Sequence, residues 1–178
     1  QFGENEFHGS GGPIKVEKIR ATFKVLDLFL EAAEEFGYKK TEDFNSGNNE
    51  GMGYFPLTVK NGFRCSTAVG YLNPVKNRKN LKIITNAHIK NIEFENNKAT
   101  NVNYWIKNNL ISVKANKEII LSAGTIGSPH ILQASGIGPG ALLKNNNINV
   151  IKDHPSVGTN LTDHLMLRPV YKVKNLET

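Results

Sequence analysis

The sequence predicts a mixed α/β (α+β) fold, and three observations lead to this prediction. Apolar residues recur at helical spacing from Phe23 to Phe36, three short strands follow one another between Ile89 and Ala115, and an apolar strand runs directly into a helix between Glu118 and Gly138. The chain has 178 residues, of which 39% are hydrophobic and 21% charged, so it is long enough to bury a globular core. Every apolar run is shorter than the roughly 20 residues that a bilayer helix needs.

The N-terminal part of the chain is expected to hold two helices and one short strand. A glycine-rich loop leads into a predicted strand at 13–16. Thr22 is a plausible N-cap for the amphipathic helix, and Gly37 ends it in the usual way. Ser66 can cap a second helix, which Pro74 stops.

The central region predicts a three-stranded antiparallel meander over 89–115. The expected strands are 89–95, 99–106 and 110–115, and asparagine-rich turns separate them. Asparagine suits such turns because it tolerates a positive φ. A meander of this kind is found as a crossover above nucleotide-binding sheets, and also in ordinary antiparallel α+β domains. Periodicity alone leaves both possibilities open.

Other apolar runs predict strands of a parallel sheet. Leu81–Thr85 is compact and apolar, and Ile119–Leu121 is continuously apolar, as in a strand buried on both faces. A short helix at 141–144, a strand at 149–151 and a last strand at 165–173 complete the expected elements.

The strand–turn–helix unit at 118–138 carries the most information about function. Its strand ends in three small residues, Ser122, Ala123 and Gly124, and a helix capped by Ser128 with Pro129 at its first position is expected to follow. Ligands of open α/β sheets bind at the carboxyl ends of strands, where helix N-termini offer free N–H groups. A nucleotide could rest on this turn, but small residues also serve simple strand–helix packing.

The segment from Gly124 to Gly138 resembles the second signature of the glucose–methanol–choline (GMC) oxidoreductases, and every fixed position of that signature is filled. Three further segments resemble the same family in the right order: 7–13, 62–72 and 155–164. The family usually has Gly where this chain has Ser156, and often Gln where it has Thr162. Choline-dehydrogenase-like members are the most similar.

This resemblance implies FAD as cofactor and a parallel FAD-binding sheet. It also implies oxidation of a primary or secondary alcohol to an aldehyde or ketone, with hydride passing to the flavin. The cofactor-binding residues carried over from the family are Ile89, whose main chain would hold the adenine, Ser122, Ala123 and Gly124 at the strand end, and Asn160, Asp163 and His164 in a loop that returns towards the flavin. For His164 a loop-bracing role competes with a direct one.

The resemblance also divides the chain into three portions. Residues 1–80 are expected to belong to a substrate domain and 81–150 to the FAD-binding domain, which includes the meander at 89–115. Residues 151–178 are expected to form the return loop and the start of the substrate-domain sheet.

Two parts of the implied machinery lie outside the sequence. The Gly-x-Gly-x-x-Gly turn that cradles the FAD pyrophosphate does not occur in it, and the family's catalytic histidine is expected beyond the C-terminus. No catalytic residue is therefore assigned, and the chain alone is expected to be inactive. A non-catalytic folded fragment or scaffold without cofactor is the alternative.

The charge and the remaining reactive residues suggest no other function. The net charge of +6 comes mostly from scattered lysines without aromatic interleaving, so a nucleic-acid partner is not expected. No metal site is expected, and Cys65 is read as a small packed residue. The other histidines, at 8, 88, 130 and 154, are interpreted as surface or structural. A small-molecule alcohol is the expected partner, and no integral membrane segment is expected. The identity of the electron acceptor stays open. A cytoplasmic location is favoured.

Overall fold

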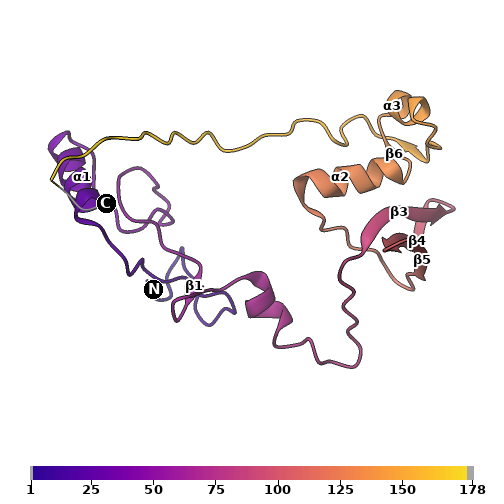
Figure 1. Ribbon diagram of the computed structural model, residues 1–178, viewed down its shortest axis with the longest axis horizontal. Helices are drawn as coiled ribbons and strands as arrows, with labels where there is room; N and C mark the ends of the chain where they lie inside the picture. Colours follow the sequence, from indigo (N-terminus) through magenta and orange to yellow (C-terminus); the bar gives the residue numbers. More distant parts are fainter. Residues whose placement is uncertain (1, 176–178) are drawn as a thin grey trace. The chain divides into compact units, whose positions relative to one another are not determined.

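The computed structural model describes residues 2–175, which form parts of two compact units (Figure 1). The first unit reaches to Ile83 and takes in the chain from Pro169, and the second is Ile84–Arg168. The predicted three-part division at residues 80 and 150 stays a prediction. Among the described residues, no helix is both long and apolar enough to cross a membrane.

The first unit is built mostly from loops around a few short elements. Its regular elements are the helix α1 (Lys24–Glu35), the hairpin strands β1 (Val59–Lys60) and β2 (Phe63–Arg64), and the π-helical turn η1 (Ala68–Leu72). Two isolated bridges, Glu17 with Leu57 and Lys40 with Met52, tie the loops together.

Several expectations for this unit need correction. The helix α1 begins at Lys24 with Phe23 as N-cap, and no side chain caps it, so the predicted Thr22 cap is wrong. The predicted strand at 13–16 does not form, because only the neighbouring Glu17 finds a backbone partner. Gly37 ends α1 as expected, with a φ of 90° that favours glycine.

Two local expectations in the same unit are confirmed. The Ser66 hydroxyl accepts the Val69 N–H at 3.3 Å, so it does cap the turn that follows. Cys65 is 1% exposed and contacts the backbone of Pro13 and Lys15, which makes it a packed residue.

The second unit contains the predicted meander. Its strands are β3 (His88–Glu95), β4 (Lys98–Ile106) and β5 (Asn109–Lys114), and they pair antiparallel in the order β3-β4-β5. The turns are tight because Asn96, Asn97 and Lys107 adopt positive φ values of 50°, 64° and 53°. The sequence prediction of the three strands is confirmed to within one residue at each end.

Helix α2 (Gly124–Ala134) packs on β3 and continues into a small parallel pair. This pair joins β6 (Ile137–Gly138) to β7 (Lys152–Asp153), with the helix α3 (Gly140–Asn145) between them. The apolar core of this unit consists of Ile92, Tyr104, Ile131 and Leu143. Figure 1 shows α2 beside the meander, with β6 and α3 near the end of α2.

The predicted parallel strands are absent from the part of the chain that the structure describes. Residues 81–85, 118–123 and 165–173 have no strand assignment, and the strand expected at 149–151 appears as β7 at Lys152–Asp153. The physical reason is the lack of neighbouring strands: a strand needs partners for its N–H and C=O groups. Ile120 is accordingly 78% exposed instead of buried on both faces.

The start of α2 also differs from the prediction. The helix begins at Gly124, four residues before Ser128, and Pro129 lies inside it. Ser128 instead accepts a hydrogen bond from the Ala123 N–H at 3.0 Å, closing the turn from within the first helical turns. The end of α2 is as expected, with Gly136 at a φ of 88°.

Candidate functional site

The turn that leads into α2 is open, as the sequence suggests. Ser122, Ala123 and Gly124 are all exposed. Gly124 has a φ of 81°, and a Cβ placed on it would find no atom within 4 Å. Because these side chains are small and exposed, the main chain of this turn is accessible to a ligand, apart from the Ala123 N–H, which donates to Ser128.

A groove of about 490 Å³ runs along α2 from this turn. One wall is the exposed side of the helix and the other is the return loop at 158–162. The lining residues are Thr125, Ile126, Pro129, His130, Gln133, Gly158, Thr159, Asn160, Leu161 and Thr162. None of them is a carboxylate, a lysine or an arginine, so the partial positive charge of the helix N-terminus is not neutralised from within the groove.

The return loop is fixed on α2 by one side chain. Gln133 donates from Nε2 to the Val157 carbonyl at 3.0 Å. Gly158 follows with a φ of 83°, and a Cβ there would lie 2.6 Å from the same Nε2 atom. The left-handed φ favours glycine here, and a larger residue would also displace the Gln133 side chain from its bond to Val157.

The structure brings some of the predicted site residues together and leaves others apart. Asn160, with a φ of 57°, lines the groove whose helix begins at Gly124. Asp163 and His164 are exposed and do not line it; the Asp163 carboxylate accepts the His164 N–H at 2.8 Å. Ile89 is half-buried in β3 opposite Tyr104, also outside the groove.

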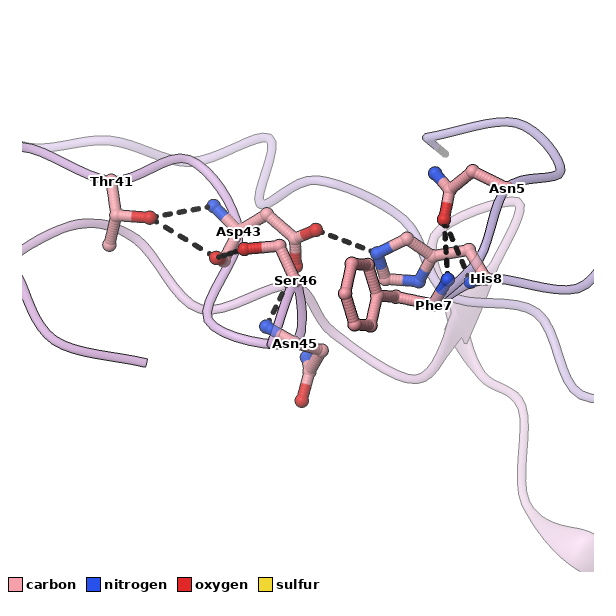
Figure 2. A network of polar contacts seen from close by, with 7 residues as sticks. All are labelled: Asn5, Phe7, His8, Thr41, Asp43, Asn45 and Ser46. Atoms are coloured by element: carbon pink, nitrogen blue, oxygen red, sulfur yellow. Dashed lines mark hydrogen bonds and ion pairs between the residues drawn. The ribbon is translucent and has the colours of Figure 1, made fainter. Parts of the chain in front are cut away.

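Sequence reasoning missed a polar cluster in the first unit, which Figure 2 shows. The Nε2 atom of His8 lies 2.6 Å from the Asp43 Oδ2 atom, and only about a fifth of each side chain is exposed. The sequence interpretation of His8 as a surface or structural histidine did not include this carboxylate partner. The two residues are 35 positions apart, so no local spacing could have revealed the pair.

Both partners of this pair are held by their own loops (Figure 2). The Asn5 side chain accepts the backbone N–H of His8 at 2.9 Å, and the Phe2 ring stacks on the imidazole at 5.0 Å. The second carboxylate oxygen of Asp43 accepts the Asn45 N–H at 2.9 Å. The hydrogen bond from His8, and then that from Asn45, hold the pKa of Asp43 below its ordinary value.

A second carboxylate in the first unit, that of Asp27, accepts a hydrogen bond from a tyrosine. Tyr54 donates its hydroxyl to the Asp27 carboxylate at 2.6 Å. This hydrogen bond, together with desolvation, raises the pKa of Tyr54 to about 12. The pair lines a cavity of about 280 Å³ beside α1.

Comparison with known proteins assigns the family. Residues 4–166 match the family described as GMC oxidoreductase. The chain therefore belongs to the GMC oxidoreductases, as the signature at 124–138 indicates.

Curated relatives include the oxygen-dependent choline dehydrogenases of two bacteria. The chain is 43% identical to that of Pseudomonas putida over 170 residues, which is 93% of this chain and 30% of that protein. It is 44% identical to that of Proteus mirabilis over 177 residues, which is 97% of this chain and 32% of that protein. The chain thus spans about a third of the length of these relatives.

Solved structures agree with the family assignment. Pyridoxine 4-oxidase from Mesorbium loti is similar with a TM-score of 0.78 and 30% identity over 83% of this chain and 29% of that one. A formate oxidase is similar with a TM-score of 0.79 and 29% identity over 88% of this chain and 27% of that one. These likenesses confirm the mixed α/β fold class.

Proposed function

We propose that the chain forms part of an FAD-dependent alcohol oxidoreductase that converts a CH–OH group to an aldehyde or ketone. The observation that carries this proposal is the bare, exposed turn at Ser122–Gly124, which opens onto an uncharged groove at the start of α2. A flat nucleotide needs such accessible main chain, and the helix N-terminus suits its phosphates. Several similar proteins support the cofactor, among them an FAD-dependent oxidoreductase from Chaetomium thermophilum.

The residues present fit the adenine end of FAD better than its reactive end. We assign the adenine to the main chain of Ile89, at the start of the outer strand β3, and the neighbouring part of the nucleotide to the exposed turn Ser122–Gly124. Asn160 lines the groove, and we propose that Asp163 and His164, further along the same loop, lie towards the flavin. When bound, FAD would supply the acceptor for the hydride and the electron pair that the alcohol carbon loses.

The chain's own part in the chemistry is to bind and to orient. Its groove contains one imidazole, that of His130, and no carboxylate, so we assign no proton transfer to it. A base that takes the alcohol proton is expected from a histidine outside this sequence. We therefore expect the chain by itself to oxidise no alcohol.

The substrate proposed is a small alcohol, and the choline dehydrogenases among the relatives make a choline-like alcohol the first to test. Oxygen, a quinone and another acceptor remain equal candidates for taking up the electrons. We keep a cytoplasmic location as a proposal.

The test is to express the uninterrupted reading frame that contains this sequence and to examine the purified product. We expect a bound flavin spectrum that bleaches when choline is added without an electron acceptor. A matched variant, Gly124→Val, places a branched side chain on the bare turn at a backbone φ of 81°. It is expected to lose flavin while staying folded. A product with no flavin, or with an unchanged flavin content in the variant, would favour the scaffold alternative.

A further inference from the structure

One buried hydroxyl joins the two elements that carry the proposed nucleotide site. Ser135 is the C-cap of α2 and is only 5% exposed. Its Oγ atom donates to the Ile131 carbonyl at 2.6 Å and accepts the backbone N–H of Ile92 at 2.8 Å. The first bond stays within the end of the helix, and the second crosses to the meander.

The hydrogen bond to Ile92 lies on the edge of β3 that has no neighbouring strand to accept its N–H groups. β3 is an outer strand of the order β3-β4-β5, so one of its edges has no strand beside it. The N–H of Ile92 points out of this free edge, since it donates to Ser135 rather than to β4. A buried N–H without an acceptor costs free energy, and the Ser135 hydroxyl removes that cost.

The same stretch of β3 is irregular. Ile89 pairs with Tyr104 but Asn91 pairs with Asn103, so Lys90 is an extra residue in the ladder. Such bulges bend a strand and turn the residues beside them, and they need support because the ladder is broken there. The bond from Ile92 lies directly after the bulge, and Ile89 lies directly before it.

Helix α2 connects this support to the other half of the site. Gly124 is its first residue and Ser135 caps its last turn, so the two ends are about 16 Å apart along a rigid helix. Fixing Ile92 to Ser135 therefore fixes the main chain of Ile89 relative to the turn at Gly124.

We propose that Ser135 is a positioning residue. Its hydrogen bond with the Ile92 N–H, called the clip below, holds the bulged start of β3 on α2. The clip thereby sets the distance between the Ile89 main chain and the Ser122–Gly124 turn so that one nucleotide can contact both. This inference rests on the proposed function, because it assigns the two ends of that spacing to the adenine side of FAD. A hydrophobic contact could press α2 on β3, but only an acceptor at this point fixes the register along the strand.

The test uses amide hydrogen exchange and titration with ADP, the adenine half of the cofactor, on isotope-labelled chain. Ser135→Ala removes the acceptor. Ser135→Thr keeps it, and Ser135→Val has the shape of Thr without the hydroxyl. We expect Ala and Val to speed exchange at Ile92 roughly tenfold or more, relative to the other β3 amides. Thr should restore slow exchange.

The ADP titration separates this inference from the proposed function. In the parent chain we expect ADP to shift the amide signals of Ile89 and Gly124 together, and in Ser135→Ala to shift them at several-fold higher ADP, with Thr restoring the parent response. No ADP-induced shift in the parent would overturn the proposed cofactor site and the role of the clip with it. A parent response that Ser135→Ala leaves unchanged would overturn the clip alone, as would uniformly faster exchange across β3, β4 and β5.

Discussion

The core of the second unit can be tested with two adjacent leucines of α3. Leu143 is 1% exposed, whereas Leu142, its neighbour on the same short helix, is 46% exposed. Replacing Leu143 by Ala removes three buried carbons, worth about 2.4 kcal/mol at ~0.8 kcal/mol each. The cavity left behind adds to this, so we expect a loss of about 3 kcal/mol within the usual range of ~2–5. Leu142→Ala should cost no more than about 1 kcal/mol, because half of that side chain is already in water.

The single tryptophan, Trp105, makes the assay specific, because it lies in β4 of this unit. When tryptophan fluorescence is followed, the Leu143→Ala variant should unfold at a much lower urea concentration than the parent chain. In thermal unfolding its midpoint temperature should fall by about 12–24 °C. A unit of about 85 residues has a total stability of only ~4–13 kcal/mol, so the loss is a large fraction of it. Equal effects of the two substitutions would refute the packing described here.

Three further predictions concern pKa values and one glycine. The pKa of Asp43 lies below its ordinary value of 3.8, so the pairing with His8 stabilises the fold above that pH, and this stabilisation is lost as the pH falls through the lower pKa of the folded state. The substitution His8→Ala should raise the Asp43 pKa in a carboxyl NMR titration, and an unmoved pKa would disprove the pairing. Because the pKa of Tyr54 is raised to about 12, its hydrogen bond to Asp27 stabilises the fold fully below pH 10, and this stabilisation is lost as the pH rises through 12. The substitution Asp27→Asn should bring the phenol pKa, read by ultraviolet absorbance, back towards 10.0, and a pKa still near 12 would exclude Asp27 as the cause. Gly136→Ala should destabilise the second unit by more than the ~1–2 kcal/mol of a left-handed backbone alone, because its Cβ would overlap the backbone oxygen of Asn149; a smaller loss in urea unfolding would contradict this.

The sequence predicted best what local chemistry decides. The meander is correct to within a residue at each end because its turns are local: Asn96 and Asn97 adopt positive φ in the first turn, and Lys107 does so in the second. The end of α2 is correct for a similar reason, since Gly136 provides the left-handed residue after the helix.

The failures concern partners that are remote in sequence. Ile119–Leu121 has the composition of a buried strand, but composition cannot supply the neighbouring strands that a ladder needs. The pair His8–Asp43 spans 35 positions and follows no motif. At α2 a local rule misled: Pro129 is typical of a first helical position, yet the helix begins at Gly124 and Pro129 lies inside it.

The candidate site was predicted in part. Its bare turn at 122–124 was expected from residue size, and the structure leaves that turn exposed. In the groove between α2 and the return loop, the hydrogen bond from Gln133 to Val157 joins the two walls, and no sequence pattern signals it. All the cofactor-binding roles stay predictions, because exposure and position in the structure neither establish nor exclude them; they concern Ile89, Ser122, Ala123, Gly124, Asn160, Asp163 and His164.

Photolabelling tests the central claim, that a nucleotide binds against the main chain of two segments: Ile89 in β3 and the Ser122–Gly124 turn at the start of α2. The chain would be irradiated with an azido-adenine analogue of ADP and the labelled peptides identified by mass spectrometry, with excess FAD as competitor. We predict label on the peptides that contain Ile89 and Ser122–Gly124, and its loss when FAD is added. Label found instead on residues 76–82, which include Lys76, Arg78, Lys79 and Lys82, and removed by salt but not by FAD, would contradict the account.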